Sequence, residues 1–127
     1  MANICENRVW ATGEVAQVQK FLSEYFDEYG FTVEKKHPST DVEGPEEYTR
    51  KWGTRWCNPT SSVVQRSKLG KHSAVFWVDT PWGPPRDMFE RISSEYPGVR
   101  FSLRYLEPDM GEMGVFQAVD GKVLRDE

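Results

Sequence analysis

The sequence predicts an α+β fold built on an antiparallel sheet. Two segments, 14–29 and 84–96, carry hydrophobic residues at steps of three and four, with charged residues between them. This spacing is typical of amphipathic helices that cover a core. Segment 99–105 instead alternates hydrophobic and polar residues, with the two-residue period of a half-buried strand. Because 127 residues is the usual length of one domain, we expect a single domain over 1–127.

The first part of the chain is predicted to form one strand and one helix. Segment 4–11 is rich in β-branched and aromatic residues and stops at Thr12-Gly13, which predicts a strand. In the helix that follows, Gly30 is placed to end the last turn in a left-handed conformation. The residues expected on the inner side of this helix are Val15, Val18, Leu22, Tyr25, Phe26 and Tyr29.

The middle of the chain is predicted to contain a short helix and a hairpin. A short strand is expected at 31–36, followed by a polar segment. Pro45 then begins a helix that ends near Trp52, because proline and the two glutamates after it suit the first turn. Segments 61–67 and 72–79 are predicted strands, and the short connection between them favours a hairpin.

The last part adds the strand at 99–105 and a terminal hairpin of 112–119 and 122–124. The resulting order of strand, helix, two strands, helix and strand is the split βαβ pattern of the ferredoxin-like fold, with two helices on one sheet face. An inserted segment at 31–58 has no defined role. The residues expected to be buried are Val15, Val18, Leu22, Phe26, Phe89, Ile92, Phe101 and Leu103.

Charge and hydropathy narrow the classes of function. The longest apolar runs are far shorter than the roughly 20 residues of a membrane span, and no basic, apolar leader opens the chain. We therefore expect a soluble cytoplasmic protein that binds no membrane. The net charge is -4, whereas a protein that grips many phosphates normally carries a basic excess. Direct nucleic-acid binding is accordingly the less favoured expectation.

The side chains that hold zinc or iron are few and scattered. They are Cys5, Cys57, His37 and His72. No two cysteines are spaced as a zinc or disulfide framework requires, and an iron–sulfur cluster takes more ligands. We expect two free thiols, with no metal and no organic cofactor.

Three tryptophans lie in turns beside glycine or proline: Trp52, Trp56 and Trp82. Such a ring can anchor a corner of the core, contact a protein partner or stack on a nucleic-acid base. The basic residues near the first two are Arg50, Lys51 and Arg55, which form only a small cluster. The sequence leaves these three interpretations open.

Carboxylates gather at the ends of predicted strands. They are Asp79, Glu107, Asp109 and Glu112. Neighbouring strands could bring them together beside Trp82, where clustered carboxylates can bind a divalent cation or share a proton. Carboxylates in turns are more often solvated or bonded to backbone amides.

Several motifs resemble the YubB ferredoxin-like domain family over nearly the whole chain. They are Met1-Ala2-Asn3 with Asn7, Trp52-Gly53-Thr54-Arg55-Trp56, Thr80-Pro81-Trp82-Gly83-Pro84-Pro85, Tyr96-Pro97, and Tyr105-Leu106-Glu107-Pro108 with Met110-Gly111. The resemblance implies the fold and an origin in phages, plasmids or other mobile elements, and it implies no active site. The chain departs from the family at Lys51 and Cys57, where asparagine and an acidic residue are frequent.

The function favoured by these observations is that of a non-enzymatic, phage- or plasmid-encoded interaction protein. An inhibitor of host defence, such as an anti-CRISPR that occludes a nucleic-acid-binding surface, fits best. We expect a monomer or small homo-oligomer that binds a host protein or ribonucleoprotein complex. The expected partner-binding residues are Trp52, Arg55, Trp56, Asp79, Trp82, Glu107 and Asp109.

Two alternatives belong to other classes of protein. The first is a carboxylate-dependent enzyme or small-ligand binder in the region of Asp79, Trp82 and Glu107. The second is a single-strand nucleic-acid module, which Trp52 and Trp56 would favour if they lined an arginine-rich sheet face.

Overall fold

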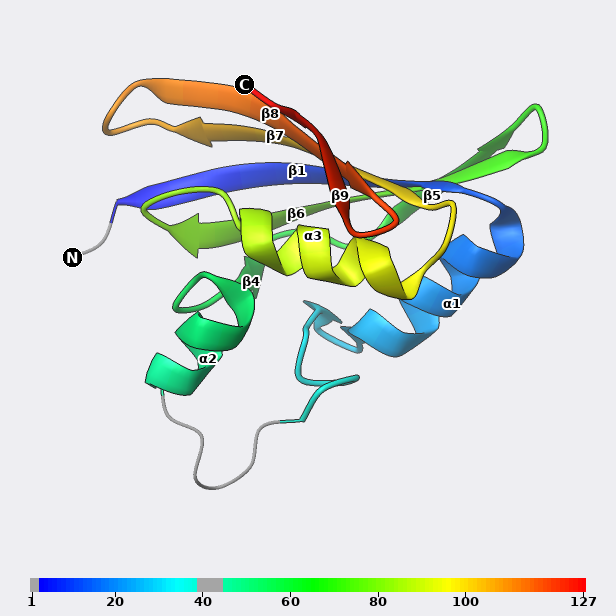
Figure 1. The fold of residues 1–127 in the computed structure, drawn as a ribbon, viewed down its shortest axis with the longest axis horizontal. Helices are drawn as coiled ribbons and strands as arrows, with labels where there is room; N and C mark the ends of the chain where they lie inside the picture. Colours follow the sequence, from blue (N-terminus) through cyan, green and yellow to red (C-terminus); the bar gives the residue numbers. More distant parts are fainter. Residues whose placement is uncertain (1–2, 39–44) are drawn as a thin grey trace.

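A computed structural model describes residues 3–38 and 45–127, which form one large sheet with helices on one side (Figure 1). The strands of this sheet are β1 (Ile4–Gly13), β4 (Asn58–Pro59), β5 (Val64–Lys68), β6 (Lys71–Pro81), β7 (Arg100–Glu107), β8 (Glu112–Val119) and β9 (Lys122–Asp126). The helices are α1 (Val15–Tyr25), α2 (Pro45–Trp52) and α3 (Arg86–Glu95), and a small ribbon is formed by β2 (Phe26–Asp27) and β3 (Gly30–Phe31).

The topology confirms the predicted ferredoxin-like fold. Strand β1 lies between β6 and β7 and is antiparallel to both. Strand β5 pairs with β6 through the predicted hairpin, while β8 and β9 extend the sheet beyond β7. Short β4 pairs with the other end of β6. The strand order is therefore the one that the split βαβ pattern requires, with an added C-terminal hairpin.

The core lies between the sheet and helices α1 and α3. Alternate residues of each central strand point toward the helices, such as Val9 and Ala11 in β1 and Phe76 in β6, and all three are buried. Aromatic rings fill much of the space, and Phe21 of α1 lies within 6.4 Å, between ring centroids, of the six rings that surround it: Tyr25, Phe26, Phe31, Phe76, Tyr96 and Phe101. Large rings thus supply the buried area that a chain with few aliphatic residues needs.

The first helix is shorter than its spacing predicts. It ends at Tyr25 rather than Tyr29, because Phe26 turns outward from the helix and pairs with Phe31 across the β2–β3 ribbon. Gly30 has a φ of 122° in that turn and does not cap the helix. Val15 and Tyr29 lie outside the packed stripe and are 46% and 81% exposed, so the expected burial of Val15 is wrong.

Other predicted boundaries differ in detail. Of the strand expected at 31–36, only Phe31 lies in β3, and the chain turns immediately afterwards. The helix expected at Pro45 is present as α2. The remaining residues expected in the core are buried, apart from Phe26, which is partly buried and packs against it. Among the described residues, none of the helices is both long and apolar enough to cross a bilayer.

Candidate functional site

The sheet face turned away from the helices carries two tryptophans that the sequence did not single out. In β1, Val9 points into the core, so its neighbours Arg8 and Trp10 point to the opposite face. In β6 the same alternation puts Trp77 on that face, between buried Phe76 and Val78. Both indoles are half-buried. Helices in the described part of the chain lie on the other side of the sheet (Figure 1).

We define the open face as this uncovered surface. Its residues are Ile4, Glu6, Arg8, Trp10 and Thr12 of β1, Val64, Arg66 and Lys68 of β5, Lys71, Ser73, Val75, Trp77 and Asp79 of β6, Arg100, Ser102, Arg104 and Leu106 of β7, Met113, Val115 and Gln117 of β8, and Arg125 of β9.

Arg8 links the two tryptophans. It is the register partner of Trp77 on one side and of Arg104 on the other. Its guanidinium carbon lies 4.5 Å from the ring centroid of Trp10 and 5.0 Å from that of Trp77. The guanidinium carbon of Arg104 lies 5.9 Å from the Trp10 centroid. Two indoles and two guanidinium groups therefore form one cation–π cluster at the centre of the sheet.

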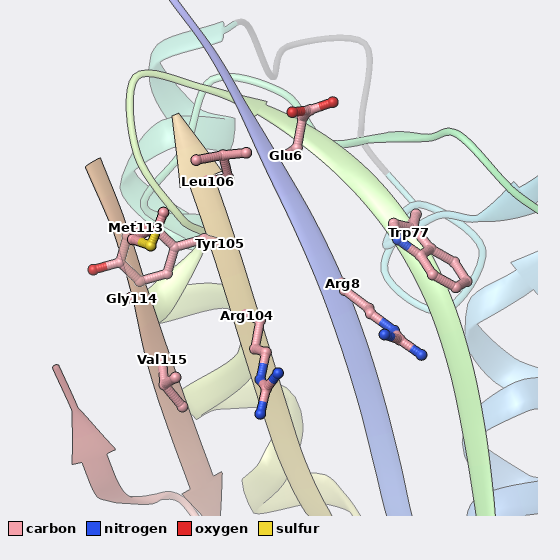
Figure 2. A pocket seen from close by; sticks show the side chains of 9 residues that line it. All are labelled: Glu6, Arg8, Trp77, Arg104, Tyr105, Leu106, Met113, Gly114 and Val115. Carbon is pink, nitrogen blue, oxygen red and sulfur yellow. The ribbon is translucent and has the colours of Figure 1, made fainter. Parts of the chain in front are cut away.

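Shallow depressions surround this cluster. One of about 470 Å³ is lined by Arg8, Trp77 and Arg104 together with Met113 of β8; Figure 2 shows Trp77 beside Arg8, with Arg104 on the neighbouring strand. A second, of about 790 Å³, lies between Trp77, Trp10 and the β5–β6 hairpin. A third, of about 420 Å³, lies between Trp10 and β7, β8 and β9. Each indole borders two depressions, so part of each ring surface is open to a ligand.

Basic side chains dominate the open face although the whole protein is acidic. They are Arg8, Arg66, Lys68, Lys71, Arg100, Arg104 and Arg125. The acidic side chains on the same side are Glu6, Asp79 and Glu127, and Glu127 accepts a 2.7 Å hydrogen bond from Arg125. Since the net charge is -4, the compensating acidic residues lie elsewhere on the molecule. The face is thus an electropositive surface with aromatic rings at its centre.

The tryptophans predicted in turns have different environments. Trp52 is 2% exposed and is covered by Arg91, whose guanidinium carbon lies 4.8 Å from its ring centroid. It therefore anchors the core and offers no contact surface. Trp56 is partly buried and Arg55 is exposed beside it, away from the open face. Trp82 is 56% exposed, so it alone of the three presents most of its ring to solvent.

The sheet separates Asp79 from the other carboxylates that the sequence suggested as a cluster, whereas Glu107 and Glu112 are direct register partners on β7 and β8. Asp79 lies on the open face opposite Glu6, and burial, aided by the Glu6 charge, raises the pKa of Asp79. Glu107 points to the helix side and is 4% exposed. Asp109 lies in the exposed turn after β7. Within the described residues, no group of three or more histidine, cysteine or acidic side chains could hold a metal ion.

The histidines and cysteines have structural surroundings. His72 lies 2.7 Å from both Ser67 Oγ and Gln65 Oε1, and His37 lies 2.9 Å from a Glu95 carboxylate oxygen. Both thiols are free, as predicted. Burial, followed by the Glu107 charge, raises the pKa of Cys5 to about 11, so this thiol is a poor nucleophile near neutral pH.

Comparison with known proteins places the fold. Residues 51–127 match the model of a family described as the ferredoxin-like domain in Api92-like protein. The chain belongs to this family. It is also similar to a solved structure, the crystal structure of a protein Api92 from Yersinia pseudotuberculosis, with a TM-score of 0.50 and 20% identity.

The likeness to that structure shows the fold alone, because the identity is low. The match covers 67% of this chain and 30% of the Yersinia protein, so the chain spans about a third of its length. No curated protein gives a significant match.

Proposed function

We propose that the open face binds single-stranded nucleic acid by stacking bases on Trp10 and Trp77. The observation that carries this proposal is the placement of both indoles, with Arg8 between them, on two adjacent central strands at the open face of the sheet. Aromatic side chains on a sheet stack bases whatever their sequence, and arginine adds cation–π contacts and binds phosphates.

The geometry favours a single strand over a duplex. Stacking on a protein ring requires an unpaired base whose face is free, which a duplex does not offer. The three depressions are shallow and border the rings, so they suit flat bases better than a double helix. The acidic net charge does not oppose binding, because a local basic surface sets the potential that a ligand meets within a Debye length of about 8 Å at physiological salt.

Binding of fluorescein-labelled ten-nucleotide strands, oligouridine and oligothymidine, tests the proposal. We expect Trp10→Ala and Trp77→Ala each to weaken binding by about 1–3 kcal/mol, or roughly 5- to 150-fold. Trp82→Ala is the matched control, since it removes an exposed indole that lines none of the three depressions. Trp10→Tyr and Trp77→Tyr keep an aromatic face and should retain most of the affinity.

Circular dichroism and melting temperatures establish that each variant is folded. A folded wild-type protein that binds neither strand at low salt, or folded alanine variants with unchanged affinity, would contradict the proposal. Tighter binding of oligouridine than of oligothymidine would identify RNA as the preferred ligand, and the reverse would identify DNA. A duplex competitor that displaces labelled oligouridine and oligothymidine as well as an unlabelled single strand does would also argue against a preference for single strands.

Trp82 supports a second candidate, the interaction protein expected from the sequence. Its indole is exposed, and its backbone has a φ of 70°, a conformation that non-glycine residues seldom adopt. Three hydrogen bonds hold the turn: Trp82 N to Asn3 O at 2.7 Å, Gly83 N to Pro81 O at 2.8 Å, and Thr80 Oγ1 to Gly83 O at 2.7 Å. A fixed, exposed aromatic ring suits a protein contact.

In this second candidate, the partner is a host protein or ribonucleoprotein complex and the biological setting is the one that the YubB resemblance implies, a phage or plasmid protein in the host cytoplasm. Anti-CRISPR inhibition is its most specific form. If inhibition is by occlusion, it should scale with the molar ratio of protein to target. Trp82→Ala should then weaken the complex by roughly 2 kcal/mol or more, while Trp10→Ala should have little effect. Inhibition at far below one protein per target would exclude occlusion.

A further inference from the structure

We propose, as a refinement that rests on the proposed nucleic-acid function, that the bound nucleic-acid strand crosses the β-strands at one end of the open face. Its phosphates lie on two groups of basic residues, one on each side, and its bases point toward Trp10 and Trp77. The hairpin arm consists of Arg66, Lys68 and Lys71, and the far arm consists of Arg100, Arg104 and Arg125.

The two arms are connected across the sheet. Arg66, Ser73, Thr12 and Arg100 are successive register partners on β5, β6, β1 and β7, so they form one row perpendicular to the strands. Ser73 Oγ and Thr12 Oγ1 lie 3.0 Å apart in the middle of this row. Three strand spacings separate its ends, or about 14 Å, a distance that a short single strand can follow between the arms.

Both arms face the same aromatic ring. The depression on the hairpin side is lined by the hairpin arm together with Trp77 and Trp10. The depression on the other side is lined by the far arm together with Trp10. A strand that occupies both depressions therefore passes Trp10 and keeps its backbone near basic side chains on each side. Arg8 is the central cation of the indole cluster and is less available to phosphate.

The other end of the open face attracts a phosphate backbone less, because it carries two carboxylates and apolar side chains. Glu6 and Asp79 are direct register partners there. Apolar Leu106 and Met113 continue the same row on β7 and β8, and apolar Ile4 is the next open-face residue of β1. Glu6 and Thr12 are six positions apart in β1, which is about 20 Å along the strand. This exceeds the Debye length of about 8 Å at physiological salt. The basic residues of the two arms, rather than repulsion by Glu6 and Asp79, thus determine where the backbone runs.

Salt dependence of oligouridine and oligothymidine binding tests this arrangement. We compare Arg66→Gln/Lys68→Gln on the hairpin arm with Arg100→Gln/Arg104→Gln on the far arm. The matched control, Lys20→Gln/Arg50→Gln, removes the same charge from exposed positions on α1 and α2. The slope of log affinity against log salt should fall by about 0.7 for each phosphate of a single strand that the variant no longer neutralises. The control variant should keep the wild-type slope.

A third variant, Glu6→Gln/Asp79→Asn, tests the end that carries the two carboxylates. Because the row from Arg66 to Arg100 lies about 20 Å from these carboxylates, the slope should change much less than it does in the arm variants. If the arm variants keep the wild-type slope while Trp10→Ala still weakens binding, this arrangement is wrong and the proposed function stands. If the Glu6 and Asp79 variant alters the slope more than the arm variants do, the backbone runs at the other end. If the wild-type protein binds neither strand, both proposals fail.

Discussion

At the scale of single residues, the amide of Asn7 joins the core to the exposed end of the sheet. Asn7 is 1% exposed, and its Nδ2 lies 3.1 Å from Val78 O, 3.1 Å from Cys5 O and 3.0 Å from Thr80 Oγ1. The Thr80 hydroxyl in turn donates to Gly83 O at 2.7 Å, which closes the turn that carries Trp82. One buried polar side chain thus fixes the position of an exposed aromatic ring.

Replacing Asn7 with alanine should therefore destabilise the fold and loosen the Trp82 turn. We expect the free energy of unfolding, measured with urea, to fall by about 1–3 kcal/mol, since buried acceptors lose their donor. Asn58→Ala is the matched control, because Asn58 is exposed and should change stability by less than about 0.5 kcal/mol. Equal stabilities of the two variants would show that the Asn7 amide has no structural role.

At the scale of elements, the segment from Thr32 to His37 contacts both long helices through ion pairs and hydrogen bonds. Lys36 Nζ lies 3.3 Å from a carboxylate oxygen of Glu24 in α1 and 3.6 Å from one of Glu95 in α3. Tyr25 donates a hydrogen bond to Glu95, and Tyr96 donates one to Glu24 at 2.6 Å. The hydrogen bond from Tyr96 lowers the pKa of Glu24.

This network predicts a loss of stability at alkaline pH. Burial, and then the hydrogen bonds that the two hydroxyls donate to Glu95 and Glu24, raise the pKa values of Tyr25 and Tyr96 above the ordinary value of 10. The folded protein keeps protons that the unfolded chain releases, so the stabilisation is complete below pH 10 and declines as the pH rises above it. Each tyrosine should contribute a slope of about 1.4 kcal/mol per pH unit there.

Urea unfolding at pH values from about 8 to 11 measures this slope. The tyrosine contribution appears in the part of this range above the ordinary tyrosine pKa of about 10. Tyr25→Phe/Tyr96→Phe should make the decline between about pH 10 and 11 shallower than in the wild type. The decline that remains comes from other side chains whose pKa values are also raised by burial, namely Cys5, Cys57 and Tyr48. Tyr29→Phe, at a side chain that is 81% exposed, is the matched control. A double variant that loses stability above pH 10 as steeply as the wild type would contradict the assignment.

The elements were predictable where one period was clear. In β7, Phe101 and Leu103 alternate with Arg100 and Ser102, so strand and buried face were both correct. In β6 both alternate sets are apolar, because Val75 and Trp77 occupy one face while Phe76 and Val78 occupy the other. The period alone could not decide which of the two faces lies against the helices, so the open face with its two tryptophans was not predicted. The sequence did contain one signal for the open face. Arg8 and Trp10 lie two and four residues after charged Glu6, so all three point to the same side of the first strand.

At the scale of the whole molecule, tertiary contacts decide what local patterns leave open. Spacing alone extended the first helix to Tyr29, but Phe26 leaves the helix to pack against Phe31 and Phe76. Turn composition grouped Asp79 with Glu107, but strand alternation puts them on opposite faces. The net charge of -4 gave no sign that basic residues share one face, because a total carries no information on position.

The whole-molecule topology also predicts that residues 51–127, the part matched by the family model, do not fold alone. They contain β6 and β7 but lack β1, which lies between these strands and satisfies the backbone groups on both inner edges. They also lack α1, whose buried Val18, Phe21 and Leu22 fill the core. The fragment should therefore show an NMR spectrum with poor amide dispersion and no cooperative thermal transition.

Adding a peptide of residues 1–38 should restore the fold, because it supplies β1 and α1 together. A peptide in which Phe21 is replaced by alanine is the matched control. It should restore the fold much more weakly, since removing a buried phenylalanine costs about 3–5 kcal/mol. Well-dispersed spectra from the fragment alone would show that β6 and β7 can close the sheet without β1, and would place the folding unit within residues 51–127.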